Sequence, residues 1–174
     1  RNLDSAEQKK IRTAFNKNSD FYAQYTFYDL GYNLRPTEIN GFLGNVQLKF
    51  IDEITKKRNK NFLELAKHIY KNKDRYLPIK FSHIDFVSNF AMPVICRSYE
   101  IKEKLISACE DKIEIRPILS GNILQQPFAQ KHLAPRAHKI RCPNARLIHE
   151  QGLYFANNPE LTNKEKKEIL NVFA

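Results

Sequence analysis

Two side chains in the first quarter of the chain have the chemistry to hold an anion. Asn33 and Arg35 lie two positions apart in the segment Gly31-Tyr32-Asn33-Leu34-Arg35-Pro36. A carboxamide N–H can donate to a phosphate oxygen, and a guanidinium can donate two parallel hydrogen bonds to one phosphate or carboxylate. Taken alone, an Asn-x-Arg triplet is also explained by a turn asparagine followed by a surface arginine. Anion binding becomes the better interpretation when Asn33 and Arg35 are considered within the longer segment from Gly31 to Leu48.

A second group of polar side chains follows a strand predicted later in the chain. Arg116 lies within a strand-like alternation, and Asn122, Gln125 and Gln126 come shortly after it. Polar side chains on a loop that leaves a rigid strand can contact a bound sugar or nucleotide. For Asn122, a left-handed turn after Gly121 is an equally simple explanation.

Several common catalytic and metal-binding signatures do not occur in this sequence. It contains no Gly-rich dinucleotide loop, P-loop, serine-hydrolase elbow or H-E-x-x-H motif. The five histidines are dispersed, and Cys96, Cys109 and Cys142 lie far apart. We therefore expect no metal site and no disulfide framework, and we interpret the cysteines as small apolar core residues. An odd number of thiols fits a reducing compartment, with the cytoplasm as the default.

The net charge favours partners that carry phosphate. Lys and Arg number 29 against 19 Asp and Glu, which gives a formal charge of +10. Because this charge is combined with a cluster of aromatic residues, namely Tyr22, Tyr25, Phe27 and Tyr28, a nucleic-acid-binding module is an alternative from another class. The lack of a basic stripe on one predicted helical face makes that alternative the weaker one. No apolar run of about 18 residues occurs, so no membrane span is predicted.

A long helix is the element that must position Asn33 and Arg35. From Thr37 to about Tyr70, apolar residues recur with helical period, which predicts one long helix or two in line. Gly41 and Gly44 interrupt the apolar stripe on adjacent turns. Each glycine costs a helix about 1 kcal/mol relative to alanine, so we expect another helix to pack closely there.

The rest of the chain alternates between strand and helix patterns. The predicted elements, in order, are a strand within 81–96, a helix from Ser98 to near Asp111, a strand-like stretch over 113–119, a loop-rich region over 120–141 with a short helix at 128–132, a helix over 144–151, a strand over 153–156, and a last helix opened by the capping box of Thr162 and Glu165. Strand, helix and strand in succession predict an α/β fold.

The segment from Gly31 to Leu48 resembles the DegT/StrS family of sugar aminotransferases. These enzymes depend on pyridoxal 5′-phosphate (PLP) and have the aspartate-aminotransferase fold, known as fold type I. In that family a Gly-Tyr-Asn-x-Arg segment opens a helix reading Thr-Glu-x-x-Ala-x-x-Gly-x-x-Gln-Leu. Here Gly31 to Arg35 is followed by Thr37-Glu38 and then by Gly44-Asn45-Val46-Gln47-Leu48.

Weaker similarity extends the resemblance from about Phe27 to the end of the chain. It includes Ile115-Arg116-Pro117, Gln126-Pro127-Phe128 and the pieces from Asn144 to Thr162. The resemblance implies an α/β fold with an α+β-like small domain, in which a few-stranded sheet is flanked by helices. It divides the chain into a connection from a large domain (1–30), a long interface helix region (31–77) and a C-terminal small domain (78–174).

The resemblance also implies a cofactor, substrates and a partner. The complete enzyme would use PLP to transfer an amino group from a donor such as glutamate to a nucleotide-linked sugar, in polysaccharide or lipopolysaccharide biosynthesis. Asn33 would reach the PLP phosphate of the neighbouring subunit, so the active site would be shared across a homodimer, and Arg35 would bind cofactor or substrate anions. The substrate would be contacted by polar side chains, namely Tyr32, Arg116, Asn122 and Gln126.

Two features refine this expectation. The run Arg-Pro-Ile-Leu-Ser-Gly-Asn, from Arg116 to Asn122, is also similar to the family branch of nucleotide-sugar 3-dehydratases, so 3-dehydration is the alternative reaction. In the family, the Schiff-base lysine, or the histidine that replaces it, lies upstream of the Gly-Tyr-Asn segment. Lys9, Lys10 and Lys17 lack the expected Ser-x-x-Lys context. We therefore expect a C-terminal part of a longer enzyme, with no catalytic residue of its own, that alone binds little PLP and is inactive.

Overall fold

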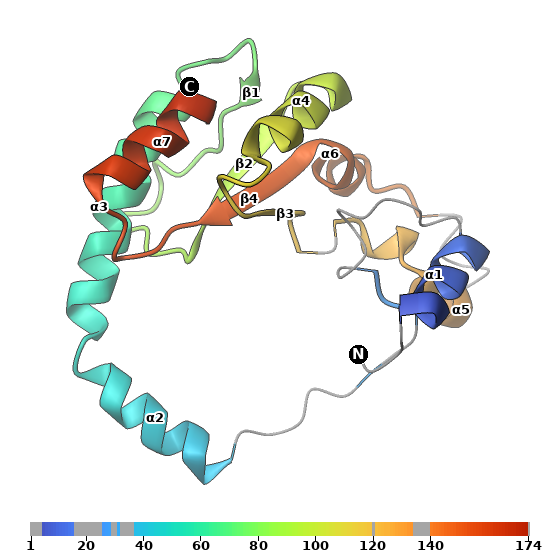
Figure 1. Ribbon diagram of the computed structural model, residues 1–174, viewed down its shortest axis with the longest axis horizontal. Coiled ribbons are helices and arrows are strands. Elements are labelled where there is room, and N and C mark those ends of the chain that lie inside the picture. Colours follow the sequence, from blue (N-terminus) through green and yellow to red (C-terminus); the bar gives the residue numbers. More distant parts are fainter. Residues whose placement is uncertain are drawn as a thin grey trace. The chain divides into compact units, whose positions relative to one another are not determined.

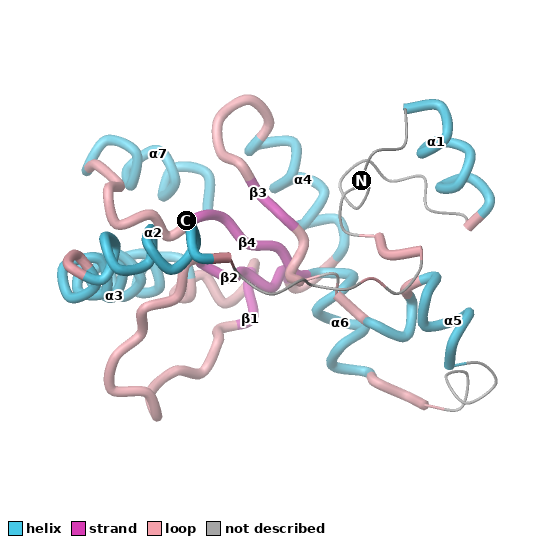
Figure 2. The backbone as a smooth tube through the Cα atoms, turned by 90° about the horizontal axis from the view of Figure 1, so that it is seen from below, coloured by secondary structure: helices cyan, strands magenta, loops and turns pink. Residues whose placement is uncertain are grey.

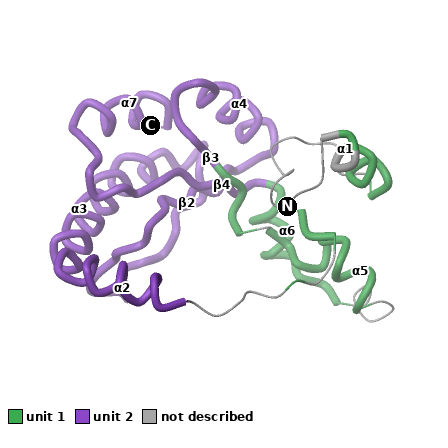
Figure 3. Tube along the Cα trace, turned by 60° about the horizontal axis from the view of Figure 1, so that its bottom comes forward, with its two compact units in different colours: residues 1–31, 116–150 green, residues 32–115, 151–174 purple. Residues whose placement is uncertain are grey.

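The structure, a computed structural model, describes residues 5–15, 26–28, 31, 37–119, 121–133 and 140–173. The order of helices and strands along the chain can be followed in Figure 1. The chain divides into two compact units, one of residues 1–31 and 116–150 and the other of residues 32–115 and 151–174 (Figure 3). Each unit is described by itself.

The sheet is built mainly from strands of the larger unit. Its order is β1 (Tyr76–Leu77), β2 (Ala91–Cys96), β4 (Gly152–Ala156) and β3 (Ile115–Arg116). Strand β2 pairs antiparallel with both β1 and β4. Every second residue of β2 is buried, as expected for a strand with one face on a core. The expected α/β fold with a few-stranded sheet flanked by helices is confirmed.

Three helices of the larger unit bury their apolar sides in the core. They are α3 (Ile51–Ile69), α4 (Tyr99–Cys109) and α7 (Asn163–Phe173). Figures 1 and 2 show α4 and α7 together on one side of the strands. The rings of Phe155 on β4 and Phe173 on α7 lie 4.6 Å apart, and both side chains are fully enclosed. Apolar burial of this kind is the main source of stability of the unit.

The predicted helix starts are confirmed. The Ser98 hydroxyl accepts a hydrogen bond from the backbone N–H of Ile101 at 3.3 Å and so caps α4. Thr162 and Glu165 form the reciprocal capping box of α7, with N–H···O distances of 2.7 and 3.2 Å. These hydrogen bonds from Thr162 lower the pKa of the Glu165 carboxyl. Pro143 begins helix α6 (Pro143–Gln151), where its missing N–H costs nothing.

The predicted long helix is divided into two successive helices. Helix α2 (Glu38–Leu48) and α3 are separated by Lys49 and Phe50. None of the residues of α2 is buried, and Ile39 and Phe42 are 71% and 69% exposed. Within the described part of the chain, nothing lies within 4 Å of a Cβ built on Gly41 or Gly44. The close packing expected at these glycines is therefore not made by the residues that the structure describes.

The strand predicted within residues 81–96 forms only at its end. β2 begins at Ala91, and the preceding residues are loop and turn, with Ile84 and Phe86 about half exposed. Here the backbone N–H of Val87 donates to the Asn59 side chain at 2.9 Å, so its hydrogen bond goes to a helix instead of a strand. Strand β3 stops before Pro117, which has no N–H to donate to a ladder.

The smaller unit consists mostly of helices and loops. It contains α1 (Ser5–Ala14), the 3₁₀ turn η2 (Ile123–Gln125), α5 (Pro127–Leu133) and most of α6. The short helix predicted at 128–132 is confirmed within α5. Among the described residues, no helix is both long enough and apolar enough to cross a membrane.

Candidate functional site

The motif segment leads directly into α2. Tyr32, Asn33 and Arg35 lie outside the described residues, and their proposed contacts stay predictions. The helix that follows begins at a defined point. The Asn40 carboxamide oxygen accepts hydrogen bonds from the backbone N–H and the hydroxyl of Thr37, both at 2.9 Å. Thr37 thus fixes where the segment ends and where the helix begins.

The loop after β3 is shaped by two of the side chains predicted to bind substrate. Asn122 is buried, and its side-chain oxygen accepts from the Leu124 N–H at 3.1 Å, which caps η2. Gln126 is also buried, and its oxygen accepts from the Phe27 N–H at 2.9 Å. The Phe27 carbonyl in turn accepts from the Phe128 N–H at 3.1 Å. Both side chains therefore have an internal role, while their contact with substrate remains a prediction.

Arg116 and Gln125 are the other polar candidates of this region. Arg116 ends β3 and is exposed, whereas Gln125 ends η2 and is half-buried. The structure therefore brings Asn122, Gln125 and Gln126 together on one short loop of the smaller unit. Of this group, only Arg116 carries a guanidinium.

Gly121 adopts the left-handed conformation in this loop. Its φ is +65°, whereas Asn122 has an extended φ of −87°, so the left-handed turn considered for Asn122 is made by the glycine. A Cβ on Gly121 would lie 2.0 Å from His149 Nδ1 and 2.6 Å from His149 Cγ. The imidazole of α6 therefore lies directly against the loop backbone. Sequence reasoning missed His149, because nothing local links it to a glycine 28 positions earlier.

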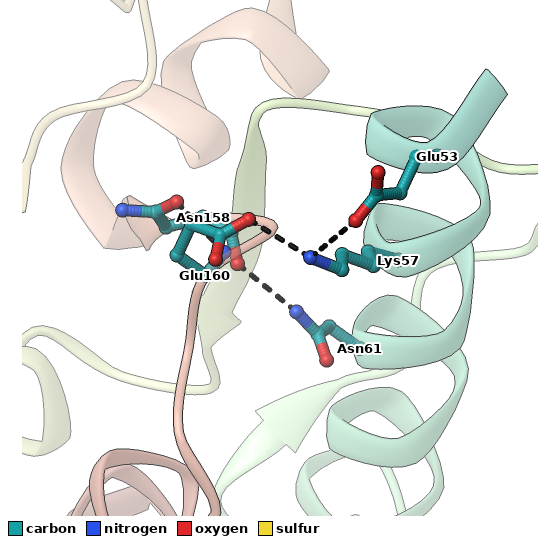
Figure 4. A network of polar contacts seen from close by, with 5 residues as sticks. All are labelled: Glu53, Lys57, Asn61, Asn158 and Glu160. Atoms are coloured by element: carbon teal, nitrogen blue, oxygen red, sulfur yellow. Dashed lines mark hydrogen bonds and ion pairs between the residues drawn. The ribbon is translucent and has the colours of Figure 1, made fainter. Parts of the chain in front are cut away.

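Helix α3 is tied to the segment after β4 by polar contacts. The Lys57 ammonium lies 2.8 Å from Glu53 and 3.0 Å from Glu160, and the Asn61 amide donates to the Asn158 carbonyl at 3.0 Å (Figure 4). The hydrogen bonds that the Lys57 ammonium donates to the carboxylates of Glu53 and Glu160 raise the pKa of Lys57. Because these charges are exposed, solvent screens them and the ion pairs contribute little to stability.

The buried cysteines are not nucleophiles in this fold. Burial raises the pKa of both Cys96 and Cys109 to about 11, so the thiols stay protonated near neutral pH. Both are free and enclosed in the core, as the sequence predicted, whereas Cys142 is half-buried. Among the described residues, no group of three or more His, Cys, Asp or Glu gathers as metal ligands.

A hollow of about 510 Å³ lies at the end of α4. Its lining includes Ile106, Cys109, Asp111 and Ile115. None of the predicted cofactor or substrate residues lines it, and no charged side chain in its lining is buried. The candidate residues therefore remain those of the Gly31 to Arg35 segment and, separately, those of the loop after β3.

Comparison with known proteins assigns the chain to a family. The family model described as the DegT/DnrJ/EryC1/StrS aminotransferase family matches residues 3–174. The chain is 29% identical over 158 residues to GDP-4-keto-6-deoxy-D-mannose 3-dehydratase of Escherichia coli O55:H7, with 87% of this chain and 39% of the relative covered. The enzyme of the same name from Yersinia pseudotuberculosis is 27% identical, with 87% and 38% covered. The chain thus spans about two fifths of the length of these relatives.

A solved structure shows the same fold. The E. coli GDP-4-keto-6-deoxy-D-mannose-3-dehydratase with bound hydrated PLP superimposes with a TM-score of 0.65 at 23% identity. The alignment covers 90% of this chain and 40% of that chain. The fold type I expected from the sequence is therefore confirmed by a neighbour of known structure.

Proposed function

The chain belongs to the DegT/DnrJ/EryC1/StrS aminotransferase family, and from this premise we propose that it is the C-terminal part of a PLP-dependent enzyme that acts on a nucleotide-linked sugar. The observation that carries the proposal is the family match from residue 3 to residue 174, which includes the Gly31 to Leu48 segment. The match offers a reason for the positive charge of the chain, since enzymes of this kind bind the phosphates of nucleotides and of PLP. We therefore prefer it to the alternative of a nucleic-acid-binding module.

The proposed reaction is 3-dehydration of the sugar, with transamination as the second candidate. Transamination was the first expectation from the sequence, since it is the activity for which the family is named. Both curated relatives described above are 3-dehydratases. The similarity of the run from Arg116 to Asn122 to that branch points the same way. We place the enzyme in the cytoplasm, where the free thiols of Cys96, Cys109 and Cys142 would stay reduced.

Asn33 and Arg35 would hold the cofactor or substrate anions. An amide and a guanidinium form a donor set that fits phosphate, because both present N–H groups and neither presents a negative charge. When bound, PLP supplies an electron sink for negative charge beside the reacting carbon of the sugar. The Asn33 amide would donate to a phosphate oxygen, and the Arg35 guanidinium would orient an anion through two parallel hydrogen bonds. The residue that bonds covalently to PLP, or its histidine replacement, would come from the upstream part of the enzyme.

The exposed side of α2 supports a homodimer with a shared active site. Ile39, Phe42 and Leu43 are each more than half exposed, and Gly41 and Gly44 leave the helix backbone open to close approach. An apolar stripe of this kind is typical of a protein interface. A partner subunit seated on α2 would bring a second active site near the Asn33 segment.

The proposed function is tested on the intact protein, with any residues that its gene places before Arg1. We expect it to retain PLP and, with glutamate and GDP-4-keto-6-deoxy-D-mannose, to yield a sugar nucleotide that has lost an oxygen. A product that has gained an amine would instead identify transamination. Mass analysis of the sugar nucleotide separates the two outcomes. A protein that neither retains PLP nor changes the sugar contradicts the proposal.

Replacing Arg35 should weaken anion binding more than replacing another cation. For Arg35→Ala in the intact protein we expect PLP affinity or the KM for the sugar nucleotide to worsen by about 10- to 100-fold, because two charge-assisted hydrogen bonds are lost. Arg35→Lys should recover only part of the loss, since an ammonium cannot form the paired contact. Lys56→Ala removes the same charge from an exposed position on α3 and serves as the control. Equal effects of Arg35→Ala and Lys56→Ala would rule out the anion-binding role.

A further inference from the structure

Two aliphatic side chains are exposed on the loop after β3. Leu119 is 74% exposed, more than any other large apolar side chain in the described part of the chain, and Ile123 is 58% exposed. The amides of Asn122 and Gln126 in the same loop are buried, and their oxygens already accept backbone N–H groups of the protein itself. The loop therefore encloses these two amides and exposes two aliphatic side chains.

Leu119 has a backbone conformation that favours glycine. Its φ is +32°. The Gly121 N–H donates to the Ile118 carbonyl at 2.7 Å, which closes a tight turn with Leu119 at its first corner. Glycine, asparagine and aspartate tolerate a positive φ at such a corner, whereas a bulky leucine is rare there. Leucine is thus a poor residue for the stability of this turn, because its backbone is strained and its exposed side chain gains no burial.

Contacts beside the corner hold the turn in this conformation. A Cβ on Gly121 would lie 2.0 Å from the His149 imidazole, so the loop backbone packs closely against α6. The Asn122 oxygen accepts from the Leu124 N–H at 3.1 Å and so fixes the start of η2. Strained residues persist only where surrounding contacts impose the conformation, and they are concentrated at ligand sites. A role in ligand binding would explain why leucine occupies this corner.

We propose that Leu119 and Ile123 bind the methyl group that a 6-deoxy sugar carries in place of a hydroxymethyl group. This inference rests on the proposed function, in which the substrate is a nucleotide-linked sugar. Arg116, an exposed cation predicted to contact substrate, precedes Leu119 by three residues, a span of at most about 10 Å. In a sugar bonded to a diphosphate, the methyl group lies within that distance of phosphate oxygens. One short segment thus offers a donor for the anionic part and aliphatic contacts for the deoxygenated part of one ligand.

The aliphatic contacts would make the loop selective for the deoxygenated sugar. A hydroxymethyl group would bring a hydroxyl against two side chains that cannot form a hydrogen bond with it, and loss of its water is unfavourable. A methyl group at the same place withdraws apolar area from water on both partners. We expect a preference of about tenfold for the 6-deoxy sugar, since aliphatic contacts discriminate only modestly against an added hydroxyl.

The test measures binding to the intact protein, with any residues that its gene places before Arg1. The ligands are GDP, GDP-D-mannose and GDP-6-deoxy-D-mannose, and the two sugars differ only in the oxygen at carbon 6. Calorimetry should give a Kd about tenfold lower for the 6-deoxy sugar. Leu119→Asn keeps a residue that tolerates the positive φ, so the midpoint of urea unfolding should not fall. It should raise the Kd of the 6-deoxy sugar to that of GDP-D-mannose and leave the Kd of GDP unchanged.

Leu133→Asn is the matched control. It removes an aliphatic side chain that is 46% exposed on α5, and all three Kd values should stay the same. Ile123→Ala should reduce the preference for the 6-deoxy sugar as Leu119→Asn does. An equal loss in Leu133→Asn, or a preference that survives Leu119→Asn, overturns the inference. A change of oligomeric state in Leu119→Asn also overturns it, because Leu119 would then belong to a subunit contact.

The three ligands separate this inference from the proposed function. If the unsubstituted protein binds both GDP-sugars with equal Kd values, the role of Leu119 and Ile123 is wrong and the proposed function stands. If none of the three ligands binds, the proposed function fails and the inference fails with it.

Discussion

Phe155→Ala should lower the free energy of unfolding by about 4 kcal/mol. The Phe155 ring is 1% exposed and lies 4.6 Å from the ring of Phe173, so its removal leaves a cavity between β4 and α7. The loss has two parts, the lost burial of the ring and the cost of a cavity that the surrounding strands cannot fill. Urea unfolding of the purified chain, followed by circular dichroism, measures the change.

Phe90→Ala is the matched control for this substitution. Phe90 is 59% exposed, although its ring contacts Tyr154 edge to face at 5.9 Å. The same truncation there should cost about 1 kcal/mol or less, because little apolar area is withdrawn from water. If the two substitutions cost the same, β4 and α7 do not form the core of this unit.

Gly121→Ala should destabilise the loop after β3 by about 3 kcal/mol. A left-handed φ of +65° costs a residue with a Cβ about 1 kcal/mol. The new methyl group would also lie between 2.0 and 2.7 Å from three atoms of His149, so the imidazole or the loop must move. We expect lower stability in urea and faster hydrogen exchange at the backbone amides of Leu124 and Gln126.

A double substitution separates the two causes. In a His149→Ala background the steric conflict is gone and only the backbone cost remains, so Gly121→Ala should cost about 1 kcal/mol there. Gly41→Ala gives a contrasting control, because nothing lies within 4 Å of that position in the described chain and the residue is helical. In the single chain, with no partner on α2, it should stabilise the helix by up to about 1 kcal/mol. Additive effects of the Gly121 and His149 substitutions would mean that the two residues are not in contact.

Features encoded within a few residues were predictable from the sequence. The caps at Ser98 and Thr162 and the proline that opens α6 depend on side chains at most four positions from the groups they satisfy. The helical period from Thr37 to Tyr70 likewise identified α2 and α3. The strand predicted from residue 81 was too long, because the composition of apolar and aromatic residues does not distinguish a strand from a loop that leaves Ile84 and Phe86 half exposed.

Contacts between distant residues could not be predicted in this way. The hydrogen bond from Asn157 to Arg58 joins residues 99 positions apart, and the one from Phe27 to Gln126 also spans 99 positions. At the candidate site, the sequence identified the polar residues of the loop after β3. It could not show that Asn122 and Gln126 are buried and shape the loop themselves. That depends on which distant segments of the chain, such as the one that contains Phe27, pack against the loop.

The bare surface of α2 has a consequence for how the protein acquires its structure. A helix of 11 residues with no buried side chain receives little hydrophobic stabilisation from the part of its chain that the structure describes, and helices of this length are marginal in water. Its helical conformation must then be stabilised largely by the surface that packs against it. If the proposed homodimer covers α2, folding of this helix and association of the subunits would be thermodynamically linked, and α2 would reach full helicity only at protein concentrations at which the dimer forms.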